Sequence, residues 1–451
     1  MTRRTAASLL GWLTEHRLEM DLLLEELVLA ESPSLEPDAL GRAMQIIERE
    51  LADVGYITRL LRGGVYGHHL YARPRDRSRH TGHQLLVGHV DTVWPRGSIA
   101  GMPFRHAGDE LYGPGVYDMK SGLVEIVFAV RALAAVGLMP EVTPVVFVNA
   151  DEEVGSVDSR RHLVRLARGA IRAFVLEGAS GRRGKLKTAR KGSGRFTLTA
   201  HGRAAHAGSS PEEGVSAILE LAEQIRRLNT FNDPGRGITV NVGMVDGGLR
   251  SNVIAPVATA EIDVRVPTEV DARRVESAIR ALRATLPGAS IEVSGGFRRP
   301  PMEPSSANAA LFRRAQELAE LVGVHVEDAG LVGGSSDANL TSPYTPTLDG
   351  LGPVGDGAHA ADERIVVSSL AERATLLALL MLEPVTPCST VTASESHDRQ
   401  MRSEVDEVFA VERSERTLLA ARAPGEVVGR PESDEPDLEI PEIEVCSSGD
   451  S

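Results

Sequence analysis

Three short apolar segments constrain the fold more than any other feature of this 451-residue chain. They read "HQLLVGHV" (83–90), "TPVVFVNA" (143–150) and "AFVLEGA" (173–179), and segments with helical apolar spacing (122–137 and 156–167) lie between them. Strands that are apolar along nearly their whole length and alternate with helices are typical of a mainly parallel sheet with helices on both faces. We therefore predict an α/β body, with Ser156 as the N-cap of the second helix.

The pattern changes near residue 192. From there the sequence predicts a strand, a helix, two strands, a helix and a strand, at 194–202, 212–228, 237–245, 257–266, 269–285 and 289–296. This β-α-β-β-α-β order is that of the split βαβ unit. We predict an inserted α+β ferredoxin-like domain at 192–297, within a discontinuous body at 1–191 and 298–385. The polar, acidic segment 386–451 holds too little apolar surface to offset the entropy of ordering, so we expect a disordered tail.

Composition excludes several classes of protein. A net charge of −14 argues against a nucleic-acid partner, which requires a basic face. Two cysteines, Cys388 and Cys446, cannot form a disulfide framework or a Cys-rich zinc site, so His and carboxylate side chains must hold any metal. The sequence contains no run of about 18 apolar residues, so we predict no membrane span. The start, "MTRRTAASLLGWLTEHRLEM", favours an amphipathic helix over a signal peptide, and we expect a cytoplasmic protein.

The stretch "VNADEEVGS" (148–156) ends an apolar strand in three consecutive acids, Asp151, Glu152 and Glu153. Neighbouring like charges repel, and burying them without a partner costs several kcal/mol. The acids therefore lie on a solvated loop or face a positive group. For Asp151 we expect the solvated position.

Further candidate ligands follow other predicted strands and turns. In "GHVDTV" (88–93), His89 and Asp91 point the same way in an extended chain, so the carboxylate can accept one ring proton and leave the other nitrogen for a metal. Asp118 in "GPGVYDMKSG" precedes a helix, where it fits both a helix cap and an oriented ligand. Glu177 in "VLEGA" and His359 in "GDGAHAADE" complete the set.

These residues all belong to strand ends or the loops after them, where sites form in open α/β sheets. Two divalent cations about 3.5–4 Å apart, bridged by a carboxylate, would neutralise such a group of acids. Zinc suits His and carboxylate ligands, and manganese or cobalt also fits. The alternative is an ordinary core histidine with solvated surface acids.

The motifs "GHVDTV", "GPGVYDMK", "DEEVGS", "HAG" and "GAH" occur in the order that resembles the co-catalytic zinc exopeptidases, over residues 20 to 383. That family includes glutamate carboxypeptidase, acetylornithine deacetylase, succinyl-diaminopimelate desuccinylase and the aminoacylases. The chain is most similar to the glutamate carboxypeptidase branch, because Glu177 stands where other branches often have Asp. The resemblance implies two zinc ions, one bound by His89 and Glu177 and the other by Glu153 and His359. It also implies that Asp118 bridges them, Asp91 orients His89 and Glu152 is the general base.

The resemblance extends to the inserted domain, which it implies is a lid and dimerisation domain. His206 in "AHGRAAHAGSS" matches a histidine that reaches the partner subunit's active site, so we expect a homodimer in which His206 stabilises the oxyanion in trans. A surface turn histidine is the alternative. Arg265 in "DVRV" and Asn252 in "GGLRSNVIAP" resemble substrate-binding residues. Arg298 or Arg299 in "GGFRRPPM" either adds positive charge to the substrate site or is a solvated surface arginine. We expect a surface position for the pair His68 and His69.

The sequence thus predicts a dinuclear-metal amide hydrolase whose substrate is a small acyl- or peptidyl-amino acid. The favoured function is a carboxypeptidase that releases a C-terminal amino acid such as glutamate, with Glu152 activating a water that bridges the metals. Ala360 and Ala361 follow His359, where carboxypeptidase relatives often carry a polar residue, and this departure leaves the substrate class open. One alternative is an N-acyl-amino-acid deacylase or aminoacylase. Another, from a different class, is a non-hydrolytic metal-dependent binding protein or an amide-forming biosynthetic protein.

Overall fold

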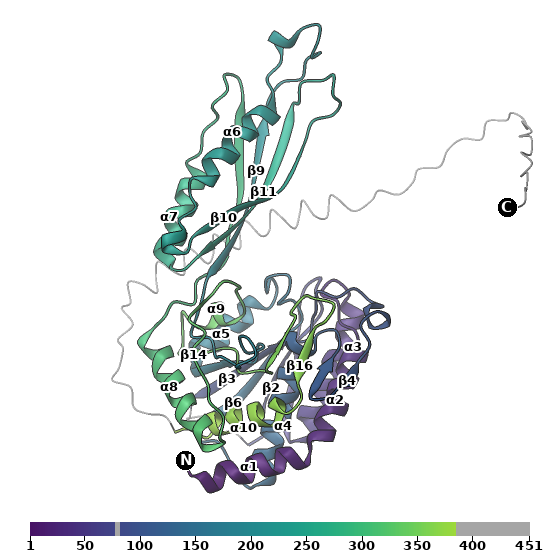
Figure 1. Ribbon diagram of the computed structural model, residues 1–451, viewed down its shortest axis with the longest axis vertical. Coiled ribbons are helices and arrows are strands. Elements are labelled where there is room, and N and C mark those ends of the chain that lie inside the picture. Colours follow the sequence, from purple (N-terminus) through teal and green to yellow (C-terminus); the bar gives the residue numbers. More distant parts are fainter. Residues whose placement is uncertain (77–81, 385–451) are drawn as a thin grey trace, which may run out of the picture. The chain divides into compact units, whose positions relative to one another are not determined.

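A computed structural model of the chain describes residues 1–76 and 82–384 (Figure 1). The predicted disordered tail, with both cysteines, lies outside the described residues. The N-terminal amphipathic pattern forms two consecutive helices, α1 (Arg3–Glu15) and α2 (Arg17–Leu29). Within the described ranges, no helix has both the length and the apolar character needed to cross a membrane.

The main sheet has six strands in the order β1-β2-β6-β3-β7-β14. The four strands from β6 to β14 pair in parallel, whereas β1 and β2 form an antiparallel hairpin at one edge and β2 pairs antiparallel with β6. The prediction of a mainly parallel sheet is confirmed, with this antiparallel edge as an addition that makes the sheet mixed. The strands are β1 (Tyr56–Leu61), β2 (His69–Pro74), β3 (His83–His89), β6 (Thr143–Asn149), β7 (Ala170–Val175) and β14 (Thr347–Leu348).

Helices cover both faces of this sheet, as predicted (Figure 1). Successive strand residues point to opposite faces, so Val146 and Val148 pack into one apolar cluster while Val145 and Phe147 pack into another. The larger cluster draws on α1, α2, α3 (Pro37–Asp53), α4 (Ser121–Ala135), α8 (Ser306–Leu321) and α10 (Ser369–Met381). The smaller cluster draws on α5 (Arg160–Gly169) and α9 (Ala338–Thr341).

The predicted β-α-β-β-α-β order is present in the second half of the chain. It consists of β9 (Gly192–His201), α6 (Ala217–Asn229), β10 (Thr239–Gly247), β11 (Val257–Val266), α7 (Glu269–Arg280) and β12 (Ser290–Arg299). These strands form an antiparallel sheet in the order β10-β11-β9-β12, with α6 and α7 packed on its own apolar cluster. We call β9 to β12 the inserted sheet; the domain boundaries at 192 and 297 stay a prediction.

A small sheet brings two distant loops together. It is antiparallel, in the order β15-β16-β5-β4, and comprises β4 (Arg105–Ala107), β5 (Glu110–Tyr112), β15 (Gly355–Asp356) and β16 (Arg364–Val366). Because β5 leads into the turn with Asp118, and β15 and β16 flank the loop with His359, their pairing fixes these two loops side by side. A two-stranded parallel pair, β8 (Ala189–Arg190) and β13 (Leu331–Val332), lies outside the other sheets.

The helix after the acidic stretch starts later than predicted. It begins at Arg160, and Ser156 does not cap it. Ser156 instead occupies a left-handed turn with φ 54°, and its hydroxyl donates to Asp337 Oδ1 at 2.5 Å. The N-cap prediction for Ser156 was therefore wrong, because a tertiary contact rather than helix capping satisfies its hydroxyl.

Candidate metal centre

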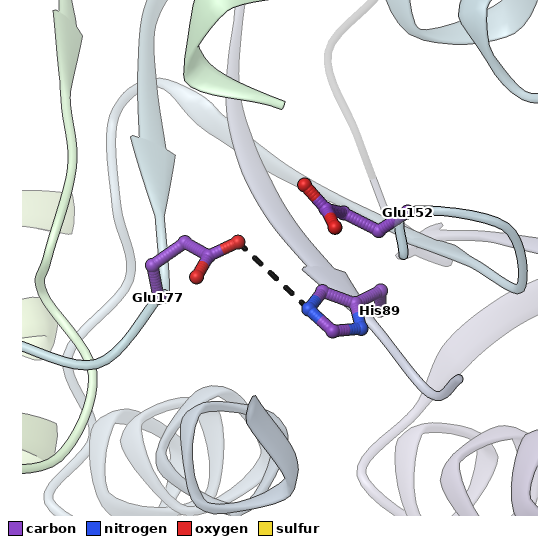
Figure 2. Close-up of side chains that lie close together, drawn as sticks. All are labelled: His89, Glu152 and Glu177. Carbon is purple, nitrogen blue, oxygen red and sulfur yellow. Dashed lines mark ion pairs between the residues drawn. The ribbon is translucent and has the colours of Figure 1, made fainter. Parts of the chain in front are cut away.

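His89 ends strand β3 and is 1% exposed. Its Nδ1 lies 2.9 Å from the main-chain oxygen of Asp91, which makes Nδ1 the protonated nitrogen and leaves a lone pair on Nε2. Nε2 lies 3.2 Å from Asp118 Oδ1 and 3.8 Å from Glu177 Oε1; Figure 2 shows the contact with Glu177. Glu177 lies two residues after β7 ends. The ring is therefore oriented as a ligand whose free nitrogen faces two carboxylates.

Asp118 follows a turn that Gly115 enters at φ 76°, and its own φ and ψ are not helical. Its side chain faces two imidazoles at once. Oδ1 contacts His89, and Oδ2 lies 3.4 Å from His359 Nε2. A carboxylate with one oxygen towards each of two histidines has the arrangement needed to bridge two cations.

Glu153 and His359 form the second half of the cluster, with Glu153 Oε2 3.2 Å from His359 Nε2. Within residues 1–76 and 82–384, Glu153 Oε1 is buried and has no hydrogen-bond partner. His359 occupies a left-handed conformation with φ 61°, in the loop between β15 and β16. A buried carboxylate oxygen normally has a partner, and a bound cation would supply one for Glu153 Oε1.

Asp91 orients other groups in addition to His89. Its carboxylate oxygens accept the main-chain N–H groups of Glu152 and Glu153, both at 3.1 Å, and the hydroxyl of Ser34 at 2.8 Å. Oδ1 also lies 3.4 Å from His89 Nδ1. The side chain of Asp91 therefore holds the turn that carries the two adjacent glutamates, whereas the hydrogen bond from His89 Nδ1 goes to the main-chain oxygen of Asp91 and not to the carboxylate that the sequence predicted.

Glu152 has a partner that the sequence did not identify. Arg299, at the end of β12 and 4% exposed, donates from Nη1 to Glu152 Oε1 at 2.5 Å and from Nη2 to Glu152 O at 2.9 Å. Nη2 also donates to Ser156 Oγ at 2.7 Å. Of the two alternatives for Arg299, the solvated surface position is excluded, because the side chain is buried against Glu152. Adjacent residues on a strand point to opposite faces, and the sequence does not say which of two consecutive arginines faces inwards.

The charges of the cluster do not balance without cations. Burial, together with the nearby Asp118 carboxylate, raises the pKa of Glu153 to about 8 and that of Glu177 to about 8. Hydrogen bonds to Asp118 and Glu153 raise the pKa of His359 to about 10. The raised pKa values show that this cluster of acids favours a positive partner, which a bound cation would supply.

The donor atoms lie close enough for metal binding. Those of His89, Glu152 and Glu177 all lie within 4.8 Å of one another, and so do those of His89, Asp118 and Glu153. Imidazole nitrogen and carboxylate oxygen are ligands that zinc accepts. The residues present therefore fit a metal centre.

Asp151 is buried, contrary to the prediction that it is solvated. Its Oδ2 accepts the main-chain N–H groups of Asp158 at 2.6 Å and Ser159 at 3.1 Å, so it ties the acidic turn to the start of α5. Burial raises its pKa to about 7.

His69 is also buried rather than on the surface, because it begins β2 beside β6. Neither of its ring nitrogens has a hydrogen-bond partner within the part of the chain that the structure describes. His68 is exposed, as predicted.

The three remaining candidates belong to the inserted sheet and its loops. His206 and Asn252 are exposed and lie on adjacent segments, joined by a hydrogen bond from Ala207 N to Asn252 O at 3.0 Å. Arg265 forms a bidentate pair with Asp263 of the same strand, at 2.8 and 2.9 Å. We call His89, Asp118, Glu153, Glu177 and His359 the metal-ligand cluster. No hydrogen bond or ion pair between described residues joins the side chains of His206, Asn252 and Arg265 to it.

Comparison with known proteins gives one family. A profile of Peptidase family M20/M25/M40 matches residues 85–383. Carboxypeptidase G2 of Pseudomonas sp. (strain RS-16) is 29% identical over 366 residues, 80% of this chain and 88% of that protein. A succinyl-diaminopimelate desuccinylase of Cereibacter sphaeroides (strain ATCC 17029 / ATH 2.4.9) is 31% identical over 374 residues, 76% and 93% of the two chains. The fold is similar to that of a Bacillus subtilis protein described as a dinuclear metal-binding peptidase of the M20 family, with a TM-score of 0.58, 15% identity and coverage of 82% and 98%.

Proposed function

The chain belongs to Peptidase family M20/M25/M40, and from that membership we propose that it is a two-metal carboxypeptidase that releases a C-terminal amino acid, such as glutamate, from a peptidyl or acyl amide. The observation that carries the proposal is the convergence of His89, Asp118 and Glu153, whose donor atoms lie within 4.8 Å of one another. Family membership makes the chain a metal-dependent hydrolytic enzyme, so only the hydrolytic alternatives are retained.

We assign His89 and Glu177 to one cation and Glu153 and His359 to the other, with Asp118 between them. We propose zinc, because the ligands are imidazoles and carboxylates. A pair of bound divalent cations lowers the pKa of a water and polarises an amide carbonyl. Asp91 supports both halves, since it contacts His89 and also holds the backbone of Glu152 and Glu153.

Glu152 is the general base in this proposal. It takes a proton from the attacking water and returns it to the nitrogen of the leaving amine. Burial raises the pKa of Glu152 and the positive charge of Arg299 opposes that shift. Because Arg299 bonds Oε1, we assign Oε2 to the water. A pKa above the usual glutamate value helps the base to hold the proton between the two transfers.

His206 supplies the hydrogen-bond donor for the oxyanion. Its Nδ1 accepts the main-chain N–H groups of Gly208 and Ser209, both at 3.1 Å. Nε2 is then the protonated nitrogen, and the exposed ring presents an N–H to a ligand. A preorganised donor of this kind stabilises the negative charge of a tetrahedral intermediate. We propose that it acts in the partner subunit of a homodimer.

The edge of the inserted sheet supports this dimer. Strand β10 is an edge strand, and Met244, Val245 and the nearby Leu249 are 65%, 60% and 72% exposed. Exposed apolar side chains on an unpaired edge are suited to pairing with a second copy of the chain. Light scattering on Met244→Glu/Val245→Lys tests this: we expect a dimer to become a monomer. A wild-type chain that is monomeric at micromolar concentration overturns the dimer.

Arg265 and Asn252 are the proposed substrate-binding residues. The pair that Arg265 forms with Asp263 is a two-pronged arginine–carboxylate contact. A substrate carboxylate has the same geometry and is an equivalent partner for the guanidinium. This supports recognition of a free C-terminal carboxylate.

An amide library tests the activity of the metal-loaded protein. We expect glutamate release from peptidyl-glutamate without acetate release from N-acetyl amino acids. The reverse result favours an N-acyl-amino-acid deacylase, the alternative that the likeness to a desuccinylase supports. Failure of the zinc-, manganese- and cobalt-loaded protein to hydrolyse any amide overturns both.

A cytoplasmic location stays part of the proposal, and cell fractionation checks it.

A further inference from the structure

Glu363 is a buried acid that lies four residues after His359, immediately before β16. It is 1% exposed, and its carboxylate accepts four N–H groups. Oε1 accepts the main-chain N–H groups of Tyr117 and Asp118, both at 2.9 Å. Oε2 accepts that of Gly115 at 2.8 Å and the indole N–H of Trp94 at 2.9 Å. The side chain therefore binds the backbone of the turn that ends in Asp118.

The main chain of Glu363 adds two contacts to the same region. Its carbonyl accepts the N–H of Gly113 at 3.3 Å, and its own N–H donates to Ala360 O at 3.0 Å, inside the loop that carries His359. One residue thus connects the backbone around His359 with the backbone around Asp118. Hydrogen bonds to an ionised carboxylate contribute more than neutral ones, and burial shields these from water.

The connection matters because the strands that join the two loops, β5 and β16, pair over three residues. The strands that flank the His359 loop, β15 and β16, are two and three residues long. His359 itself is half-exposed and adopts φ 61°. By contrast, His89 ends a seven-residue strand that pairs on both sides.

From these contacts we infer that Glu363 is a positioning residue that sets the separation of Asp118 and His359, and thereby the binding of one of the two cations. The inference rests on the proposed function, in which Glu153, His359 and Asp118 hold that cation. His89 and Glu177 depend on β3 and β7 instead, so Glu363 affects the other cation only through the shared Asp118. Residues that hold metal ligands in place without contacting the metal typically contribute 10- to 100-fold to metal affinity.

Calorimetric titration of the metal-free full chain with zinc tests the inference, with cobalt absorption spectra as a second readout. In Glu363→Gln an amide NH2 replaces one carboxylate oxygen and opposes an N–H donor. We expect one of the two binding steps to weaken about 10- to 100-fold and the other, which shares only Asp118, to weaken less, and kcat to fall with little change in KM. The matched control is Asp362→Asn, the neighbouring exposed carboxylate, which forms an ion pair with Arg364.

Trp94→Phe provides a milder variant that removes only one donor to Glu363, so the question stays open to test even if Glu363→Gln does not fold. We expect a weakening of the same binding step, smaller than in Glu363→Gln. Two unchanged binding steps in folded Glu363→Gln overturn the inference alone. A wild-type chain that binds no pair of ions overturns the proposed function as well, which separates the two failures.

Discussion

The metal-ligand cluster and the inserted sheet differ in how fully one chain assembles them. In the body, His89, Asp118, Glu153 and His359 contact one another at 3.2 to 3.4 Å. On the inserted sheet and its loops, His206 and Asn252 are exposed and Arg265 is paired with a neighbour of its own strand. The proposed metal binding therefore needs residues of the body alone, whereas the proposed substrate and oxyanion contacts need an additional partner. Variants that separate metal content from turnover test this contrast.

The largest effect is expected for Glu152→Gln, which removes the base and keeps the shape of the side chain. Turnover should fall about 10²- to 10⁴-fold, with two metal ions still bound by elemental analysis. Glu152 also lies within ligand distance of His89 and Glu177, so a loss of bound metal would show that it is a ligand and break the assignment. Glu19→Gln, at an exposed position of helix α2, is the control.

His206→Ala is expected to lower kcat about 10²- to 10³-fold, the usual effect of removing one oxyanion donor. Metal content and thermal stability should not change, because the side chain is exposed and its hydrogen bonds are local. Mixing inactive His206→Ala with inactive Glu152→Gln tests action in trans. Heterodimers with one intact composite site should regain activity, and mixtures that stay inactive count against a contribution from the partner.

Arg265→Ala should raise KM for substrates with a free C-terminal carboxylate by roughly tenfold or more, since a hydrogen bond to a charged group contributes about 1.5–3 kcal/mol. The effect should disappear with the C-terminal amide of the same substrate. Arg195→Ala, an exposed arginine of strand β9, serves as the control. Equal losses for the acid and the amide would show that Arg265 has only a structural role.

The smallest effect at neutral pH is expected for His69, which belongs to the body. Burial lowers its pKa to about 4, below the value of about 6.5 in an unfolded chain. Between these values the unfolded state binds a proton that the folded state does not, so stability falls as the pH drops from 6.5 towards 4. The slope is about 1.4 kcal/mol per pH unit.

Urea unfolding at several pH values measures this slope. His69→Gln should unfold with a flatter dependence than the wild type between pH 6.5 and 4, and His68→Gln, at the exposed neighbouring position, should follow the wild type. If His69→Gln keeps the wild-type slope, the acid sensitivity of the body comes from other groups.

Much of the fold followed from local patterns. The strands at 83–89 and 143–149 were predicted to within one residue, because each is an apolar run with turn residues after it. The order of elements in the inserted sheet was predicted for the same reason. The β1–β2 hairpin was missed, because an antiparallel edge with mixed burial has no long apolar run.

Within the site, the sequence by itself determined which residue types follow the strands and that the adjacent acids need either solvent or positive partners. Only the tertiary structure decided which neighbours those acids have. Arg299 faces Glu152, Asp151 is buried against the start of α5, and Glu363 holds the turn of Asp118. The physical reason is that these contacts join residues that are far apart in the chain or depend on which face of a strand is buried. Local sequence propensity encodes neither kind of contact, whereas the packing of the sheets determines both.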